Sequence, residues 1–152
     1  MKKIRLFKPD LTSQELKAVE RVFKKSWVGQ GPEVVKFENE FKRFVKSKNA
    51  IATNSGSAAL HLAVSAFNFK KRKNILVNNL TFVSSANAVL FNNLKPILID
   101  CDPVTLGFDL EDAKKKINKN TVAIIVVHYG GHPAEMEKIM LFAKKNKIKV
   151  IE

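Results

Sequence analysis

The clearest strand signal in this chain is Val122-Ala123-Ile124-Ile125-Val126-Val127, followed directly by His128-Tyr129-Gly130-Gly131-His132-Pro133. Five of the six residues in the first stretch are Val or Ile, without any alternation of apolar and polar positions. A strand that is apolar on both faces is typical of a parallel sheet covered by helices on both sides. The two glycines that follow predict a tight turn at the carboxyl end of this strand.

Similar strands occur on both sides of this stretch and alternate with helical patterns. Strands are predicted at Ala50–Thr53, Ile75–Val77, Pro96–Ile99 and Ile148–Ile151. Helices are predicted at Thr12–Lys25, from Pro32 onward, at Ser57–Phe67, Ser84–Phe91 and Asp109–Asn118, and from Pro133 onward. The alternation of strand and helix predicts an α/β fold with a mostly parallel sheet, built as a three-layer sandwich.

The sequence divides into residues 1–48, which are all helix and loop, and residues 49–152, which contain every predicted strand. We interpret the first part as an N-terminal helical arm and the second as a partial sheet domain. The chain ends at Glu152, in or just after a strand, whereas functional loops of parallel sheets follow the carboxyl ends of strands. We therefore expect the second domain to be truncated at its C-terminus.

Composition excludes several classes of protein. The net charge is +13 and lysine greatly outnumbers arginine, but the lysines are spread along the sequence. We interpret them as solvated helix faces and do not expect nucleic acid as a partner. One cysteine excludes an intramolecular disulfide and fits the cytoplasm, and no apolar run approaches the ~20 residues of a membrane span. Three scattered histidines do not form a metal site.

Three motifs follow predicted strands. In Thr53-Asn54-Ser55-Gly56-Ser57-Ala58-Ala59-Leu60, small residues begin a helix, whose N-terminal N–H groups suit a phosphate, although Ser55 or Ser57 could simply cap the helix. Phe82 could cover a planar ring or lie in the core. His128 could carry a proton, contact a ring or make a structural hydrogen bond.

Together these motifs resemble the DegT/DnrJ/StrS-type sugar aminotransferases. The chain has Gly56-Ser57-Ala58-Ala59-Leu60-His61-Leu62 where the family has a Gly-Thr-Ser-Ala-Leu-His-Leu stretch. Four further stretches are similar and occur in the same order: Trp27-Val28-Gly29-Gln30-Gly31-Pro32, Thr81 to Ala88, Lys95 to Leu106, and His128 to Ala134. The final Val150-Ile151-Glu152 also matches, so the resemblance covers nearly the whole chain.

The resemblance implies the N-terminal part of the large domain of fold type I, with pyridoxal 5'-phosphate (PLP) as cofactor. It implies that Gly56, Ser57 and Ala58 hold the PLP phosphate and that Phe82 stacks on the pyridine ring. Trp27, Gln30 and His128 are expected on the substrate side. The ring-pairing aspartate and the Schiff-base lysine of the family are expected beyond Glu152, so no catalytic residue is assigned within this chain.

The function implied by the resemblance is transfer of an amino group, with glutamate as the expected donor, to a keto-sugar nucleotide in the biosynthesis of polysaccharide or glycan precursors. The family resemblance also implies a homodimer. Two alternatives stay open: a PLP-dependent sugar dehydratase of the same family, and a non-catalytic regulatory or pseudoenzyme fragment. Whether the chain is itself an enzyme also stays open.

Overall fold

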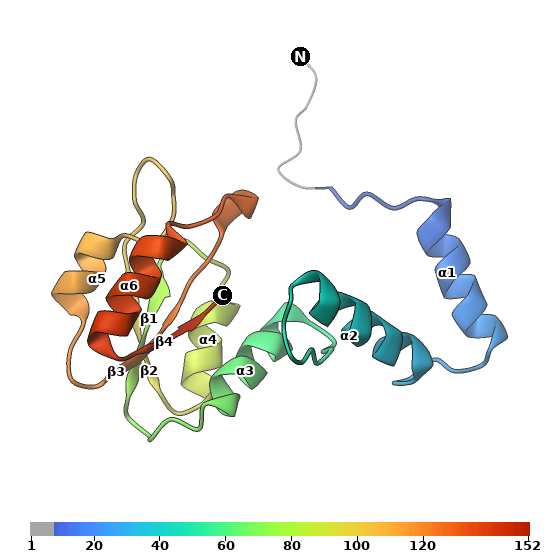
Figure 1. The fold of residues 1–152 in the computed structure, drawn as a ribbon, viewed down its shortest axis with the longest axis horizontal. Coiled ribbons are helices and arrows are strands. Elements are labelled where there is room, and N and C mark those ends of the chain that lie inside the picture. The colour runs from blue at the N-terminus through green and yellow to red at the C-terminus, as the bar shows by residue number, and fades with distance from the viewer. Residues whose placement is uncertain (1–7) are drawn as a thin grey trace, which may run out of the picture. The chain divides into compact units, whose positions relative to one another are not determined.

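The structure is a computed structural model that describes residues 8–152. The chain separates into two compact units, Met1–Ala52 and Thr53–Glu152, which we name the arm unit and the sheet unit. The division into 1–48 and 49–152 stays a prediction. Figure 1 shows the described part of the arm unit as helix and loop, and the sheet unit as a sheet with helices around it.

The helices of the arm unit begin where the sequence predicts. Helix α1 (Ser13–Lys24) begins after Thr12, whose Oγ1 accepts a hydrogen bond from Gln14 N at 3.1 Å. Glu15 completes the capping box by accepting from Thr12 N at 2.7 Å, and the bonds from Thr12 lower the pKa of Glu15. Helix α2 (Pro32–Phe44) has Pro32 at its first position, where the missing N–H has no helical partner to lose.

The apolar side chains of the arm helices are not buried. Neither α1 nor α2 contains a buried residue, and Phe37 and Phe41 form an exposed aromatic pair with ring centroids 5.9 Å apart. The predicted strand at Ala50–Thr53 is wrong. Those residues have no strand conformation, and Ile51 is 72% exposed, because no neighbouring strand pairs with them in the described chain. The local pattern thus predicts helices correctly but does not determine what covers them.

The sheet unit contains four parallel strands: β1 (Asn74–Asn78), β2 (Lys95–Ile99), β3 (Thr121–Ile125) and β4 (Lys149–Ile151). Their spatial order is β2-β1-β3-β4, and each neighbouring pair is parallel. The central pair is β1 with β3, in which Leu76 lies opposite Ile124 and Val77 opposite Ile125. The predicted parallel α/β architecture is confirmed.

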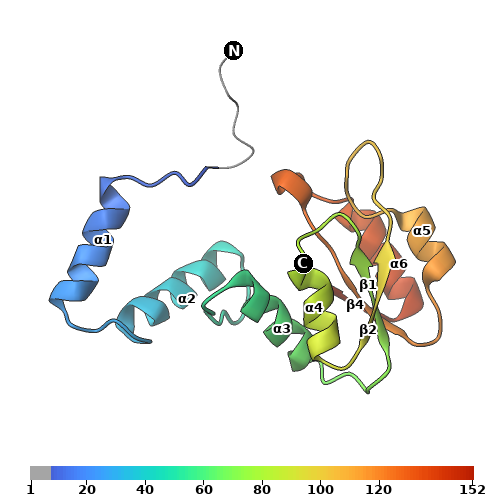
Figure 2. The same ribbon diagram turned by 180° about the vertical axis from the view of Figure 1, so that it is seen from behind.

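Helices cover both faces of this sheet (Figures 1 and 2). Helices α3 (Gly56–Ala66) and α4 (Ser84–Phe91) pack on one face, and α5 (Leu110–Lys116) and α6 (Met136–Asn146) on the other. Successive side chains of β1 pack on opposite faces of the sheet. Ile75 and Val77 pack against α3 and α4, whereas Leu76 packs in the core with α5 and α6. This division explains why the strands are apolar throughout.

One predicted helix start is displaced. Helix α6 begins at Met136, not at Pro133, because the chain first forms a 3-10 turn, η1 (Tyr129–Gly131). Gly130 and Gly131 have φ of 62° and 81°, a conformation that favours glycine. The predicted turn after β3 is therefore present, but it is longer than the sequence pattern indicates.

A carboxylate connects α5 to the end of β2. Asp112 accepts a hydrogen bond from Asp100 N at 2.8 Å and from Lys116 Nζ at 2.6 Å. The hydrogen bond from Lys116 and that from Asp100 lower the pKa of the Asp112 carboxyl. The folded protein therefore favours the ionised form of the Asp112 carboxyl more than the unfolded chain does.

Replacing Ile124, which is fully buried on β3, tests the core. Ile124→Ala should lower the free energy of unfolding by about 2–5 kcal/mol, because it removes buried methyl groups and leaves a cavity. Urea unfolding of the full chain measures this loss. The control is Leu141→Ala on α6, where the side chain is 69% exposed and the change should stay within about 0.5 kcal/mol. Equal losses at both positions would contradict the described core.

Replacing Asp112 tests its bridge between α5 and β2. Asp112→Asn should lower the Tm by a few degrees at neutral pH, because the ion pair with Lys116 is lost. A carboxyl whose folded pKa is lowered stabilises above its unfolded pKa, and that contribution disappears as the pH falls through the folded pKa. The two melting curves should therefore converge in acid. Glu111→Gln, which removes a more exposed pair with Lys114, should change little at any pH.

Candidate functional site

The direction of the strand connections reverses between β1 and β3. The chain leaves β1 through α4 toward β2, and it leaves β3 through α6 toward β4, in the opposite direction. These two helices lie on opposite faces of the sheet. Ligands of open parallel sheets bind at such a point, outside the carboxyl ends of the strands. The segments carrying Phe82 and His128 follow these two strands, so this edge is the candidate site.

The N-terminus of α3 also lies in the sheet unit and is open to solvent. Ser55 is its N-cap, and its Oγ accepts a hydrogen bond from Ala58 N at 3.2 Å. Ser55, rather than Ser57, therefore caps this helix, and the Ser57 hydroxyl is exposed and not used for capping. A Cβ added at Gly56 would meet no atom within 4 Å, so space is open beside the first turn.

This arrangement fits a phosphate group. The first N–H groups of a helix have no acceptor within the helix, and the helix dipole favours negative charge there. Gly56 and Ser57 provide such N–H groups, and the Ser57 hydroxyl can donate a further hydrogen bond. Ala58 N is already bonded to Ser55, so a bound phosphate would share that donor or displace Ser55 Oγ from it.

Phe82 is exposed at the start of α4. Its side chain is 74% exposed, which excludes a core position for it. It lies in the segment after β1. A hydrogen bond of 2.8 Å between Thr81 Oγ1 and Ser85 Oγ connects this segment to the first turn of α4. An exposed aromatic ring at the carboxyl edge is available for stacking on a planar ligand.

His128 is held by two neighbours. Its Nδ1 accepts a hydrogen bond from Ala134 N at 3.0 Å, and its Nε2 lies 3.5 Å from Glu152 Oε2. A neutral imidazole that accepts at Nδ1 carries its proton on Nε2. The ring therefore presents an N–H toward the carboxylate that follows β4. Glu152 received no role in the sequence interpretation, because its proximity to His128 follows from the pairing of β3 with β4.

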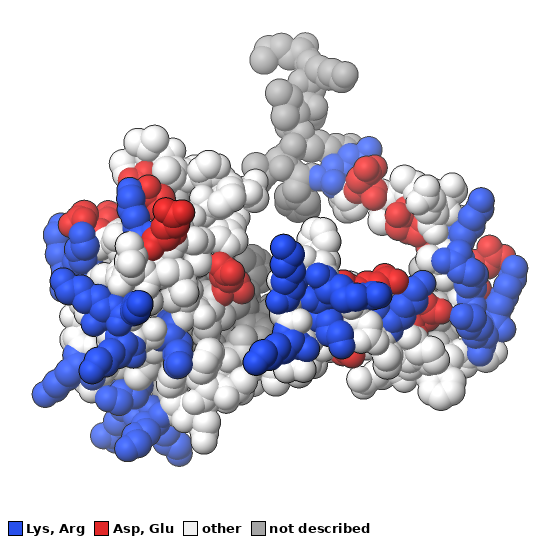
Figure 3. Space-filling view, viewed as in Figure 1, with Lys and Arg blue, Asp and Glu red and all other residues white. Residues whose placement is uncertain are grey.

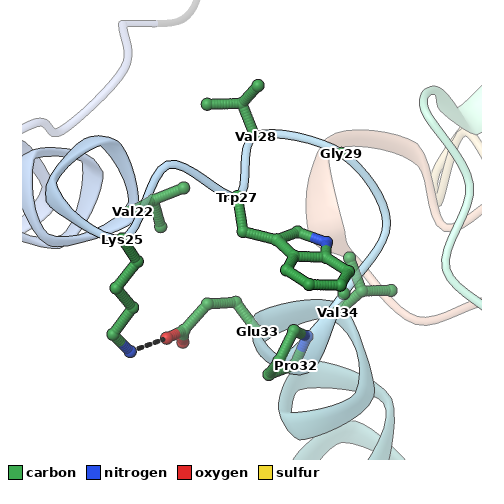
Figure 4. A pocket seen from close by; sticks show the side chains of 9 residues that line it. Val22, Lys25, Trp27, Val28, Gly29, Pro32, Glu33 and Val34 are labelled. Atoms are coloured by element: carbon green, nitrogen blue, oxygen red, sulfur yellow. Dashed lines mark hydrogen bonds and ion pairs between the residues drawn. The ribbon is translucent and has the colours of Figure 1, made fainter.

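Trp27 and Gln30 lie in the arm unit, where Trp27 lines a pocket of about 310 Å³ (Figure 4) and Gln30 is not among the lining residues. The Trp27 indole donates from Nε1 to Gln30 O at 2.9 Å, so the backbone of Gln30 holds the ring. A Cβ at Gly31 would lie 2.2 Å from Trp27 Nε1, so only glycine allows this packing. Lys25 and Glu33 form an ion pair at 3.0 Å beside the ring.

Asn78 is a residue that the sequence interpretation missed. It ends β1 and is fully buried, and neither atom of its amide has a partner within residues 8–152. Buried amides in proteins normally have partners. The only sequence signal was a polar residue directly after the apolar run Ile75–Val77.

Residues 8–152 include no cluster of His, Cys, Asp or Glu side chains that could hold a metal ion. In the same range, every helix is too short or too polar to cross a membrane.

Comparison with known proteins identifies the family. The model of the DegT/DnrJ/EryC1/StrS aminotransferase family matches residues 9–152. The chain is 35% identical to GDP-perosamine synthase of Escherichia coli O157:H7, covering 100% of this chain and 42% of that protein. It is 34% identical to a dTDP-4-dehydro-2,3,6-trideoxy-D-glucose 4-aminotransferase of Saccharopolyspora spinosa, covering 98% of this chain and 39% of that protein.

Solved structures agree. The aminotransferase from Psychrobacter cryohalolentis matches with a TM-score of 0.86 and 32% identity, over 93% of this chain and 36% of that one. A GDP-4-keto-6-deoxymannose-3-dehydratase with a trapped PLP–glutamate geminal diamine matches with a TM-score of 0.89 and 25% identity. The match covers 97% of this chain and 40% of that one. The chain thus spans about two fifths of the length of these relatives. It belongs to the DegT/DnrJ/EryC1/StrS aminotransferase family.

Proposed function

We propose that this chain provides the phosphate- and ring-binding side of a PLP site in a sugar aminotransferase. The open N-terminus of α3 is the observation that carries the proposal, because its donors and free space suit a phosphate. Family membership and the PLP named with a solved relative support the choice of cofactor. When bound, PLP supplies an electron sink for chemistry at the carbon next to an amine.

In this proposal, each residue has a separate task. Gly56 and Ser57 bind the phosphate through backbone N–H groups and the Ser57 hydroxyl, and Ala58 N contributes if Ser55 Oγ releases it. Phe82 covers one face of the pyridine ring and excludes water from it. These contacts orient the cofactor but do not carry out proton transfer.

His128, Trp27 and Gln30 belong to the substrate side of the proposal. His128 would contact the substrate with its partly exposed ring, while Ala134 N and the Glu152 carboxylate hold its two nitrogens. The substrate class is a keto-sugar nucleotide with glutamate as amino donor, supported by the nucleotide sugars in the names of the relatives. A homodimer is part of the same proposal for the whole protein.

A sugar dehydratase is the second candidate, because structures of GDP-4-keto-6-deoxymannose-3-dehydratase also match this chain. Gly56, Ser57 and Ala58 at the phosphate would serve both reactions, and so would Phe82 at the pyridine ring. These residues therefore do not discriminate between an aminotransferase and a dehydratase. Assays of the whole protein would do so, since only the aminotransferase releases an aminated sugar.

Binding of pyridoxamine 5'-phosphate tests the cofactor cradle without activity. This ligand has no aldehyde and cannot form adventitious Schiff bases with the many surface lysines. Ser57→Ala should weaken its binding by roughly 10-fold or more, because a hydrogen bond to a charged group is lost. Binding of pyridoxamine, which lacks the phosphate, should not change. Isothermal titration of the full chain measures both.

Matched controls distinguish the cradle from the rest of the same helices. Ser65→Ala, in the last turn of α3, should bind like the wild type. Phe82→Ala should weaken binding of both ligands, whereas Phe91→Ala, an exposed phenylalanine at the other end of α4, should not. Unchanged binding in both Ser57→Ala and Phe82→Ala would contradict the assigned pocket.

A further inference from the structure

The edge of the sheet opposite the candidate site carries a concentration of positive charge. Because the strands are parallel, the loops that enter them all lie at the amino edge: residues 67–73, 92–94, 117–120 and 147–148. These loops, the strand starts that follow them and the last turn of α6 form what we name the basic edge. Its cationic residues are Lys70, Lys71, Arg72, Lys73, Lys95, Lys119, Lys144, Lys145, Lys147 and Lys149.

No acidic residue of the sheet unit lies at this edge. The acidic residues follow strands or begin helices, toward the carboxyl edge: Asp100, Asp102, Asp109, Glu111, Asp112, Glu135, Glu137 and Glu152. In Figure 3 the charged atoms at the lower end of the sheet unit are blue, and its red atoms lie higher. The two edges of one sheet therefore have opposite charge character.

The positive charges are exposed and are not neutralised. Ion pairs of the sheet unit, within residues 8–152, involve Lys114, Lys116, Lys138 and His128, and none involves a residue of the basic edge. All members of the edge are exposed except Lys73, which is half-buried. Their mutual repulsion is therefore left without compensation inside the described protein.

Helix dipoles explain only part of this distribution. Lys144 and Lys145 lie in the last turn of α6, where the dipole favours positive charge. Lys70, Lys71 and Lys119 lie in loops, and Lys95 and Lys149 are on strands. The dipole effect fades within a turn of a helix end, and sheets have only small dipoles. Neither helix dipoles nor sheet dipoles therefore account for the positive charges at the loop and strand positions.

The basic edge is held by backbone hydrogen bonds. Lys95 N donates to Lys73 O at 2.9 Å, and Arg72 N donates to Asn93 O at 3.3 Å. Asn74 N donates to Asn120 O at 3.0 Å, which joins a third loop to the first. The cations therefore project from a fixed platform and not from an unstructured tail.

Apolar side chains accompany the cations on the same edge. Phe67 is exposed, and its ring stacks on Phe69 with centroids 5.2 Å apart, directly before Lys70. Leu90 and Phe91, 53% and 66% exposed, end α4 beside the loop that leads to Lys95. Aromatic and aliphatic side chains next to lysines are typical of surfaces that contact the headgroup region of a bilayer.

We propose that the basic edge docks peripherally on an anionic lipid bilayer. Lysine acts as a hydrated point charge and suits a diffuse anionic surface, whereas phosphate-backbone and base recognition favours the arginine fork, and Arg72 is the only arginine of this edge. Docking in this way leaves the carboxyl edge, with the candidate site, open to water. The proposal does not depend on the cofactor assignment.

Sedimentation with vesicles tests the proposal on the full chain. The wild type should bind vesicles of phosphatidylcholine and phosphatidylserine, should not bind phosphatidylcholine alone, and should be released by high salt. The triple variant Lys70→Gln, Lys71→Gln, Lys73→Gln should partition roughly 100-fold more weakly, given the attraction expected for each lysine near such a surface. Phe67→Ala should weaken binding further without changing its salt dependence.

A variant with the same net charge is the control. Lys17→Gln, Lys46→Gln, Lys48→Gln removes three charges from the arm unit and should keep most of the binding. Circular-dichroism melts of each variant confirm that it is folded. Equal losses in both triple variants, or no binding by the wild type, would overturn the proposal. So would tighter binding to duplex DNA than to vesicles at the same salt, lost in the Lys70–Lys73 variant, which would assign the edge to nucleic acid.

Discussion

The parallel pairing of β1 with β3 is the constraint on which the sheet unit depends. Leu76, Val77, Ile124 and Ile125 face each other across this pair with almost no exposed surface. Backbone groups so deeply buried must be paired, and the ladder between these strands pairs them. Parallel neighbours also require crossover helices, which cover both faces and account for the apolar residues on each. The three layers therefore follow from the central pair.

The same constraint separates two kinds of surface. Every strand ends at one edge, where helices begin, so helix N-termini, glycine turns and short polar side chains collect there. Helices α3, α4, α5 and α6 end at the opposite edge, where the loops of the sheet unit are rich in lysine. Gly56 and Gly130 are useful at the first edge because they leave space or accept a positive φ. The candidate functional site and the proposed membrane contact thus lie at opposite edges of one sheet.

The arm unit shows the limit of local information. The capping box at Thr12 and Glu15 and the proline at the start of α2 mark the helix starts correctly, because caps act through hydrogen bonds a few residues away. The apolar face that includes Phe37 and Phe41 is equally clear in the sequence, yet these side chains are exposed. A periodic pattern indicates that a face is apolar, but it carries no information about the surface that meets it.

The sequence by itself determined the parallel α/β class, the starts of α1 and α2 and the family, because each depends on residue type at short spacing or on motif order. It misplaced a strand at Ala50–Thr53 and the start of α6, where pairing partners and turn length matter. Only the tertiary structure decided that Ser55 caps α3, that Phe82 is exposed and that Glu152 lies beside His128. It also decided that lysines distant in sequence share one edge. The proximity of Glu152 to His128 and the shared lysine edge depend on which strands become neighbours, and the order β2-β1-β3-β4 is set by packing across the whole sheet and not by any local pattern.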